Sequence, residues 1–452
     1  MPQGKGSSDV KRTGEPDPSH VSSDEGRPHV SRRELVQLGG AVAVAAAVPI
    51  AMNDTPSAAA AALQSDAEAT PIMVAEADAL PPAIPPWMKE WGPLPSEYGS
   101  RSVYENGVVR LPSATSSRSP LRDFFGTMTP TSLFYERHHA GVPTIDPKLH
   151  RLIVHGLVDR PTVFTMDDLK RYPSVSVINF MECSGNSGSE WTEERIAATV
   201  QAGFGLVSQG EFTGVPVKLI LEEVGVQPEG TWVLAEGADA AGMTRSIPME
   251  KLLDDSLLVY AINGEMLRPD NGYPLRLFNP GWEGNSSVKW LRRLEVGTEP
   301  WETREETSKY TDPMPDGSAR QFTFTMEAKS VITYPSGGDV ISEQGYHEIT
   351  GLAWSGRGAI TRVEISTDGG ETWADAALQD PVLPVALTRF RFPWTWEGQA
   401  ARLMSRCTDD TGYVQPTIAA LVEVRGTRSN YHMNGIKSWA VSENGEVTSA
   451  WG

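Results

Sequence analysis

The hydrophobic and polar positions over 121–315 predict a mixed domain of strands and short helices. Apolar runs such as HRLIVHGLV and TWVLAEG are typical of strands, and they alternate with segments of helical spacing. Thr165 precedes acidic residues, which is typical of a helix N-cap. Asn263-Gly264 is typical of a two-residue hairpin turn. One segment places its apolar residues on a single helical face: Val217, Ile220, Leu221 and Val224.

The pattern changes after the segment TDPMPDG, which indicates a domain boundary. Beyond it, apolar and polar residues alternate, so that Val363 and Ile365 would face inward and Arg362 and Glu364 outward. About seven short strands in about a hundred residues predict an immunoglobulin-like β-sandwich over 320–428. The predicted fold class is therefore α+β, with a mixed α/β domain over 119–315 followed by the sandwich.

The two ends of the chain lack this patterning. Residues 1–62 predict a disordered leader in which Arg32 and Arg33 precede a short apolar run, and this leader resembles a twin-arginine export signal. Glu34 and Leu35 depart from that signal, so an uncleaved anchor or a chance arginine pair stays an alternative. A Pro-rich extension over 63–118 follows, and residues 429–452 predict no more than a contact arm.

The net charge of the chain and its predicted export signal limit the partners that we expect. The chain has 452 residues and a formal net charge of -19. Residues 1–62 carry six basic and seven acidic side chains, so their removal would leave -18. This acidity disfavours nucleic acid and anionic membranes as partners, and we expect no membrane span in the mature chain. We expect a periplasmic or otherwise exported protein. Because the twin-arginine route moves folded proteins, it hints at a cofactor bound before export.

The chain has two cysteines, Cys183 and Cys407. A disulfide between them is disfavoured, because Cys407 lies in a strand-like run of the second domain, where it would pack as a small apolar residue. Cys183 lies in a loop of Ser, Gly and Asn and has four interpretations. The first three are a buried structural thiol, a nucleophile and a zinc ligand. The fourth is the single thiolate ligand of a softer metal whose other ligands belong to an organic cofactor. No second cysteine or paired histidines lie near enough in sequence for tetrahedral zinc.

A second chemical candidate is the loop within NGYPLRLFNPGWEGNSSVKWLRRLEV, over 271–296. Small polar residues would let backbone N–H groups approach an anion, and Arg276 and Lys289 would neutralise a phosphate. The spacing of a nucleotide-binding P-loop is missing. An ordinary surface loop with solvated charges is the alternative.

These motifs together resemble the sulfite oxidase family of molybdenum enzymes, over about residues 120–430. The matching stretches are ERHHAGVP, MECSGN, EGAD, YPLRLFNPGWEGNSSVKWLRRLEV, SKYTD, GLAWSGRGAITRVEISTDGGETW and VQPTIAALVEVRG. The ERHH and WEGN variants look most like the molybdenum subunit of bacterial sulfane dehydrogenases. The resemblance implies a molybdopterin-binding domain, with one molybdopterin per chain, and a second domain for dimerisation.

The resemblance also implies roles, position by position. Cys183 matches the cysteine whose thiolate binds molybdenum. Arg137 matches an arginine that attracts the sulfur oxyanion, and Tyr310 matches a tyrosine beside the metal. Arg425 matches an arginine of the second domain that reaches toward the substrate pocket. The residues expected to hold the cofactor are Tyr135, His139, Cys183, Asp239, Asn271, Arg276, Ser287 and Lys289.

Two departures from animal members bear on the substrate. Asn271 replaces a histidine, so it can hydrogen-bond but cannot titrate. Ser187 and Gly188 lie where animal sulfite oxidases carry a further basic residue. A less cationic pocket would bind free sulfite more weakly and would leave room for sulfur carried on another protein.

The expected activity is therefore oxidation of a carrier-bound sulfane sulfur, or of sulfite. The chain has no C-x-x-C-H motif and nothing like a cytochrome b5 domain, so we expect no haem and a separate c-type cytochrome as electron acceptor. A sulfur-carrier protein and a homodimer through the second domain are the other expected partners. Alternatives are a sulfite dehydrogenase, a molybdenum reductase of the same family, and a non-catalytic exported binding protein. A cysteine hydrolase is disfavoured because nothing fixes a base beside Cys183.

Overall fold

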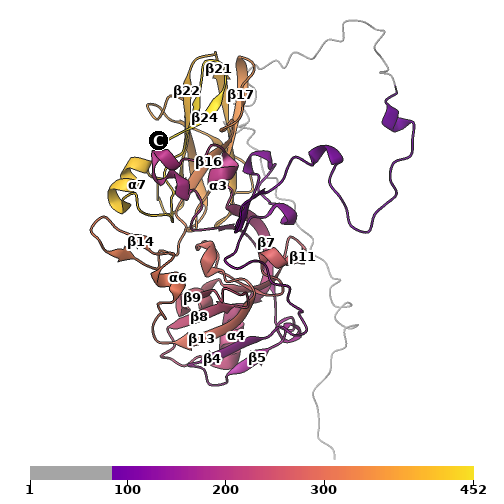
Figure 1. The fold of residues 1–452 in the computed structure, drawn as a ribbon, viewed down its shortest axis with the longest axis vertical. Coiled ribbons are helices and arrows are strands. Elements are labelled where there is room, and N and C mark those ends of the chain that lie inside the picture. Colours follow the sequence, from indigo (N-terminus) through magenta and orange to yellow (C-terminus); the bar gives the residue numbers. More distant parts are fainter. Residues whose placement is uncertain (1–83) are drawn as a thin grey trace, which may run out of the picture. The chain divides into compact units, whose positions relative to one another are not determined.

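The structure is a computed structural model, and it describes residues 84–452. The expected leader and export signal lie outside the described residues, as does the start of the Pro-rich extension. Residues 84–452 belong to one compact unit, and Figure 1 labels some of its elements. In this part of the chain, no helix has the length and apolar character needed to cross a bilayer.

The first domain contains a mixed five-stranded sheet with the order β5-β4-β13-β8-β9, in which β4 and β13 are parallel and the other pairs antiparallel. Its core is formed by Leu152, Val154, Leu291, Leu294 and their neighbours. The strands of this sheet are β4 (Leu152–Gly156), β5 (Thr162–Phe164), β8 (Trp232–Gly237), β9 (Thr244–Pro248) and β13 (Leu291–Gly297).

A second sheet of the first domain is antiparallel, with the order β11-β10-β7-β6 and β12 paired with β10. It consists of β6 (Val175–Glu182), β7 (Val207–Pro216), β10 (Leu257–Ile262), β11 (Glu265–Met266) and β12 (Arg276–Phe278). Three short strands form a third sheet: β1 (Leu111–Pro112), β2 (Ser116–Arg118) and β3 (Glu136–Arg137). The ends of strands from these sheets carry the residues of the candidate site.

The local predictions for this domain are confirmed. Helix α4 (Val217–Val224) buries its four predicted apolar residues and ends at Gly225, whose φ of 69° is the left-handed conformation typical of a helix C-terminus. Thr165 caps α2 (Met166–Leu169) in a reciprocal capping box with Asp168. Strands β10 and β11 pair through Asn263-Gly264, and the φ values of 51° and 80° are those of a type I′ turn. The other α-helices of residues 84–452 are α3 (Val200–Phe204), α5 (Met249–Asp254), α6 (Arg304–Thr307) and α7 (Ile418–Arg425).

The second domain is the predicted β-sandwich, and a short β14–β15 hairpin (Asp312–Pro313, Ala319–Arg320) precedes it. One sheet has the order β16-β17-β21-β20 and the other β19-β18-β22-β23-β24. The first contains β16 (Lys329–Tyr334), β17 (Gly345–Trp354), β20 (Ala377–Leu378) and β21 (Thr388–Trp396). The second contains β18 (Ile360–Ser366), β19 (Ala374–Asp375), β22 (Ala401–Asp409), β23 (Ser438–Val441) and β24 (Val447–Ala450).

The alternation predicted for β18 is confirmed at three of its four positions. Val363 and Ile365 are buried and Arg362 is exposed. Glu364, expected to face solvent, is only 6% exposed. The guanidinium groups of Arg362 and Arg406 cover its carboxylate, with the closest contacts at 3.1 Å and 2.8 Å.

Two predicted boundaries differ from the structure. Residues 429–452, expected to form a separate tail, contain β23 and β24, and β23 extends the sandwich by pairing with β22. The short sequence of this hairpin has little alternation of its own, so only pairing with β22 reveals it. The expected extension over 63–118 likewise ends inside the first domain, because β2 pairs with β3.

Candidate active site

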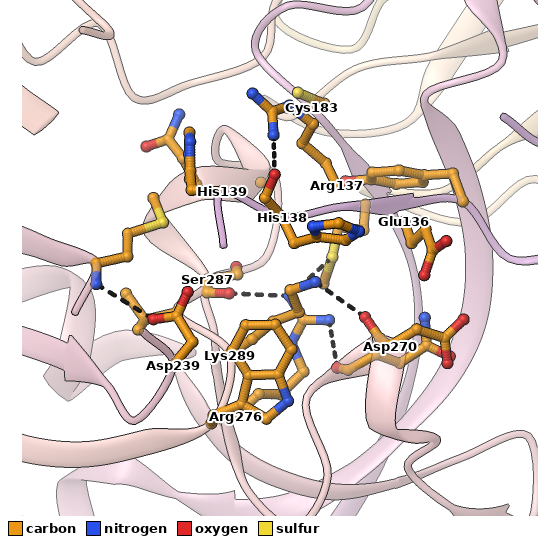
Figure 2. Close-up of a pocket in the computed structure, with 18 of the residues that line it drawn as sticks. Glu136, Arg137, His138, His139, Cys183, Asp239, Asp270, Arg276, Ser287 and Lys289 are labelled. Carbon is orange, nitrogen blue, oxygen red and sulfur yellow. Dashed lines mark hydrogen bonds between the residues drawn. The ribbon is translucent and has the colours of Figure 1, made fainter. Parts of the chain in front are cut away.

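A cavity in the first domain is lined by almost every residue for which a role was predicted (Figure 2). The short strand β3 and the loop after it contribute Arg137 and His139. The chain just after β6 contributes Cys183. The segments around β8, β12 and β13 bring in most of the others. The predicted residues that line this cavity, called the inner cavity below, are Tyr135, Arg137, His139, Cys183, Asp239, Asn271, Arg276, Ser287, Lys289 and Tyr310. Their chemical roles stay predictions.

Cys183 is the first residue after β6, and its position is fixed by backbone hydrogen bonds. Its N–H donates to the carbonyl of Leu206 at 3.0 Å, and its carbonyl accepts from Asn186 at 2.8 Å. Burial raises the pKa of the thiol, whereas the backbone N–H of Gly185 and the charge of Arg137 lower it. Both cysteines of the chain are free and buried, and Cys407 packs in the sandwich core as predicted.

The residue before Cys183 ties this loop to the second domain. The Glu182 carboxylate is fully buried and accepts from Lys329 Nζ at 2.6 Å and from Trp354 Nε1 at 2.7 Å. Asn186 donates to the same carboxylate at 2.9 Å. The β-sandwich therefore helps to hold the cysteine loop, a contribution that the sequence did not suggest.

One end of the inner cavity has the properties of an anion site. Arg276 donates to the carbonyls of Asn271 and Ser287, both at 2.9 Å, and Lys289 donates to the carbonyl of Asp270 at 2.9 Å. Within residues 84–452, neither cation has a carboxylate within salt-bridge distance. Burial lowers the pKa of Arg276 to about 10, and burial together with Arg276 lowers the pKa of Lys289 to about 7. An anion bound here would restore the charge of Lys289.

Asn271 supplies a second sign that a polar group belongs in this cavity. Its side chain is 2% exposed, and its Oδ1 atom has no hydrogen-bond partner in the described part of the chain. A buried amide oxygen without a partner costs about 1–3 kcal/mol. An N–H donor of a bound ligand would satisfy it. The residues present therefore fit a molybdopterin, which has both a phosphate and many N–H groups.

At the other side of the cavity, His139 and Tyr310 form a pair. His139 Nε2 and the Tyr310 hydroxyl are 2.8 Å apart. Burial, with Arg137 and Lys309, lowers the pKa of His139 to about 4, so its imidazole is neutral near pH 7. Burial, and then Cys183, raise the pKa of Tyr310, which keeps its proton. The pair therefore offers neutral hydrogen-bonding groups beside the thiol.

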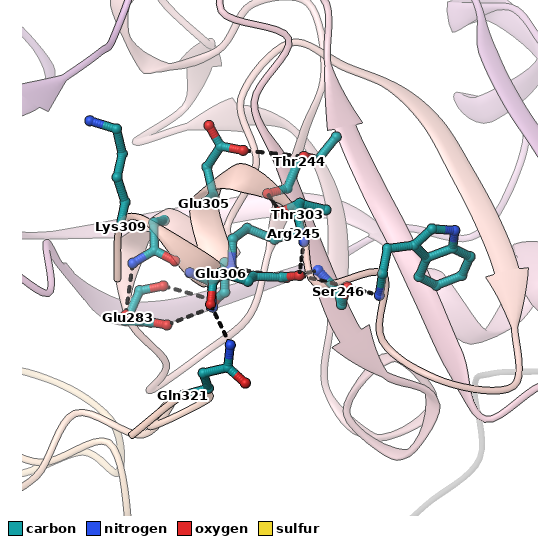
Figure 3. A network of polar contacts seen from close by, with 12 residues as sticks. Thr244, Arg245, Ser246, Glu283, Thr303, Glu305, Glu306, Lys309 and Gln321 are labelled. Carbon is teal, nitrogen blue, oxygen red and sulfur yellow. Dashed lines mark hydrogen bonds and ion pairs between the residues drawn. The ribbon is translucent and has the colours of Figure 1, made fainter. Parts of the chain in front are cut away.

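A buried polar network fixes the segment that carries Tyr310 (Figure 3). Arg245 donates to Glu283 at 2.9 Å and lies 3.6 Å from Glu306, and its guanidinium carbon is 5.5 Å from the Tyr310 ring centroid. Glu306 closes a capping box with Thr303 at the start of α6. Tyr310 has a φ of 51°, an unfavourable value for a non-glycine residue, and this network maintains it.

A second cavity, called the entrance cavity below, shares Arg137, His139, Cys183 and Tyr310 with the inner one. Its other cations are Arg118, Arg195 and Lys309, and no acidic residue lines it. The expectation of a less cationic pocket than in animal members, drawn from Ser187 and Gly188, stays a prediction, and these cations come from other parts of the chain. Arg195 lies twelve residues after Cys183, and it donates to the carbonyl of Gly188 at 2.9 Å.

The structure does not bring Arg425 to either cavity. Arg425 is 2% exposed, forms an ion pair with Asp312 and donates to the carbonyl of His432 at 3.1 Å. Its place beside Asp312 corrects the expectation that it reaches the substrate pocket. Through these contacts it holds residues 429–432, of which Asn430 and Tyr431 line the entrance cavity.

Sequence reasoning missed Arg118, Arg195 and Lys309. Arg118 and Arg195 lie in no motif with recognisable chemistry, whereas Lys309 lies in the SKYTD stretch, and three separate segments bring the three cations together. Only Lys309 carried a signal, since it lies next to Tyr310. Within residues 84–452, no three or more His, Cys, Asp or Glu side chains form a cluster able to hold a metal ion.

Two family models match the chain. Residues 139–305 match the oxidoreductase molybdopterin binding domain, and residues 320–438 match the Mo-co oxidoreductase dimerisation domain. Together with the cavity around Cys183, these matches define a two-domain molybdopterin oxidoreductase.

Similarity to known proteins identifies the family of this chain. The chain is similar to the crystal structure of the sulfane dehydrogenase SoxCD from Paracoccus pantotrophus, with a TM-score of 0.80 and 45% identity over 83% of this chain and 99% of that chain. It is 31% identical to mitochondrial sulfite oxidase of Mus musculus, over 68% of this chain and 60% of that protein. It is 33% identical to the NADH nitrate reductase of Solanum lycopersicum, over 64% of this chain and 36% of that protein. The chain belongs to the sulfite oxidase family of molybdenum enzymes, and it spans about 60% of the length of the mitochondrial sulfite oxidase.

Proposed function

We propose that this protein is an exported dehydrogenase that uses molybdopterin-bound molybdenum to oxidise a reduced sulfur compound. The substrate is a carrier-bound sulfane sulfur or sulfite, and the electrons pass to a separate c-type cytochrome. The observation that carries this proposal is the position of Cys183, which lines both the inner cavity and the cation-rich entrance cavity. A metal bound to its thiolate would lie where the two cavities meet.

The inner cavity would hold the cofactor. Arg276 and Lys289 would bind its phosphate, and Asn271 Oδ1 would accept a hydrogen bond from it. Tyr135, His139, Asp239 and Ser287 line the rest of this cavity. The bound molybdenum supplies two-electron oxidation of the sulfur atom.

The residues of the chain itself would orient and stabilise the substrate. Arg137 lines both cavities, where its charge would offset that of a sulfur oxyanion. Tyr310 keeps its proton, so it would donate a hydrogen bond to an oxygen of the substrate. His139 is neutral near pH 7 and bonded to Tyr310, and it would set the direction of that hydroxyl.

The two candidate substrates draw support from different observations. The similarity to a protein described as a sulfane dehydrogenase favours carrier-bound sulfane sulfur. The cations of the entrance cavity favour a small anion such as free sulfite. A reductase of the same family is the third candidate, because a nitrate reductase is among the relatives.

The remaining partners follow from charge and from the second domain. A chain of net charge -19 is suited to a basic cytochrome c. The match to a dimerisation domain supports a homodimer. The arginine pair in the leader supports export by the twin-arginine route.

Steady-state assays of the purified, cofactor-loaded protein test this function. We expect the protein to reduce cytochrome c when sulfite, or a carrier protein loaded with sulfane sulfur, is the electron donor. We expect no reduction of nitrate when a reduced dye is the electron donor. Activity with sulfite alone would identify a sulfite dehydrogenase, and activity only after addition of the carrier would identify a sulfane dehydrogenase. Nitrate reduction, or inactivity of molybdenum-loaded protein with both sulfur substrates, would overturn the proposal.

A further inference from the structure

The entrance cavity collects positive charge in a strongly acidic protein. Its four cations are Arg118 in β2, Arg137 in β3, Arg195 at the end of η7 (Glu193–Arg195), and Lys309 after α6. None of them forms a salt bridge within residues 84–452, and no Asp or Glu lines the cavity. Like charges repel, so this arrangement is unfavourable unless an anion is bound among them.

The four cations fall into two tiers. Arg118 and Arg137 are partly buried, whereas Arg195 and Lys309 are exposed. In the inner tier, Nε of Arg118 is buried and has no hydrogen-bond partner in the described chain. A buried guanidinium N–H without a partner indicates that a ligand atom belongs beside it.

Arg195 is held in place yet keeps donors for a ligand. Its Nη2 atom donates to the carbonyl of Gly188 at 2.9 Å and to Oδ1 of Asn430 at 3.0 Å. These two bonds fix the guanidinium at the cavity wall, and Nε and Nη1 remain available. The charged guanidinium therefore offers single N–H donors, from Nε and from Nη1, to the oxygens of a sulfonate-type group.

We infer that the entrance cavity is a two-tier binding site for a sulfur oxyanion, and that Arg195 is its specificity-determining residue in the outer tier. The inference rests on the proposed function in taking the bound anion to be a substrate or product. Arg195 would supply, from η7, the positive charge that Ser187 and Gly188 do not supply. The ligand class is a terminal SO₃ group, either free or at the end of a chain carried by another protein.

Equilibrium binding to cofactor-loaded protein tests this inference without turnover. Sulfate is the probe for a free oxyanion, and S-sulfocysteine is the probe for a carried one. At low ionic strength, Arg195→Gln should weaken binding of at least one probe about tenfold, the loss expected for one charge-assisted hydrogen bond. Arg195→Lys should lose less, because it keeps the positive charge. Arg160→Gln is the matched control, since Arg160 is exposed, lines neither cavity and changes the net charge equally.

The outcomes separate the inference from the proposed function. If Arg195→Gln and Arg160→Gln bind both probes equally well, the inference is overturned, even if the wild type oxidises sulfite. If Arg195→Gln alone loses binding, the inference stands, even if the wild type proves inactive with sulfur substrates. A larger loss for sulfate would identify the free oxyanion as the ligand, and a larger loss for S-sulfocysteine the carried one. A rise in KM for sulfite without a matching fall in kcat would distinguish anion binding from a general structural effect.

Discussion

Arg276 is buried and Lys289 is partly buried, and their hydrogen bonds go to backbone carbonyls and, for Arg276, also to the Met181 sulfur. Burial and mutual repulsion make this arrangement unfavourable until an anion arrives. The same pair that would bind the phosphate of the cofactor therefore destabilises the protein without it. The pH dependence of the stability of the cofactor-free protein measures this destabilisation.

We predict that cofactor-free protein becomes more stable as the pH rises from 7 to 9. The pKa of Lys289 is about 7 in the folded chain, whereas an unfolded lysine has a pKa of about 10.4. In this window the unfolded state binds more protons, so the free energy of unfolding rises with pH. Denaturant unfolding across the window measures the effect.

The contribution of Lys289 is isolated by comparing variants. Lys289→Met should lose the rise, whereas Lys218→Met, at an exposed position on α4, should keep it. Loading the cofactor should also remove the rise, because the phosphate restores the lysine's charge. Identical pH dependence in the wild type and Lys289→Met would contradict this account.

Gly188 offers a second prediction at the residue scale. A Cβ atom at this position would lie 2.6 Å from the backbone carbonyl oxygen of Asn430. This distance is too short for both backbone segments to keep their positions. We expect Gly188→Ala to lower the free energy of unfolding by about 1–3 kcal/mol, the usual cost of overpacking. Thermal unfolding measures it. Gly185→Ala is the control, because its nearest contacts would be 3.9 Å away, and equal losses in the two variants would count against the close approach.

At the scale of elements, the end of β6 meets the start of β16 through Glu182 and Lys329. Both side chains are buried, and Trp354 and Asn186 complete the hydrogen bonds of the carboxylate. We predict that Lys329→Met lowers the free energy of unfolding by about 3–5 kcal/mol, because it leaves a buried charge without its partner. Urea denaturation tests this.

The matched comparison for Lys329 is an exposed ion pair of the same sandwich. Arg391→Met removes the partner of Glu348 at the protein surface and should cost less than about 1 kcal/mol. The double variant Glu182→Gln/Lys329→Met should recover part of the loss. If it recovers nothing, Lys329 acts through packing and not through charge.

Elements with local signals could be predicted from the sequence. The Thr165 cap, the buried face of α4 and the Asn263-Gly264 turn each depend on residues within a few positions of one another. The strand β23 could not be predicted, because its pairing with β22 joins residues far apart in sequence.

The same distinction applies to the site. Cys183 and the residues of the 271–296 loop were recognisable because each lies in a distinctive local stretch of sequence. Arg195 was not recognisable, since no motif contains it and its place depends partly on a hydrogen bond to Asn430, which is far away in sequence. Arg425 was misplaced for a related reason, because its partner Asp312 lies in another part of the chain. Motifs thus identify residues that line the inner cavity, whereas the surrounding charge depends on tertiary structure.

At the scale of the whole molecule, the net charge of the chain and the charge of its entrance cavity have opposite signs. The chain carries a net charge of -19, yet its entrance cavity is lined by cations. Such a distribution would attract a basic electron acceptor to the general surface and an anionic substrate to the cavity.

We predict that reduction of a basic cytochrome c slows about tenfold as ionic strength rises from low salt to about 0.15 M, because salt screens the attraction between the proteins. Stopped-flow measurements at saturating substrate isolate the step from substrate binding. Ferricyanide, an anionic acceptor, should show no slowing under the same conditions. Equal slowing with both acceptors would contradict electrostatic attraction of the cytochrome.

The central claim is that Cys183 is the one protein ligand of molybdenum, and the metal content of two serine variants tests it most directly. Cys183 and Cys407 are both buried free thiols, but only Cys183 lines the cavities. We predict about one molybdenum per chain in the wild type and in Cys407→Ser, and a large loss of bound metal in folded Cys183→Ser. Full molybdenum content in folded Cys183→Ser, or none in the wild type, would contradict the account.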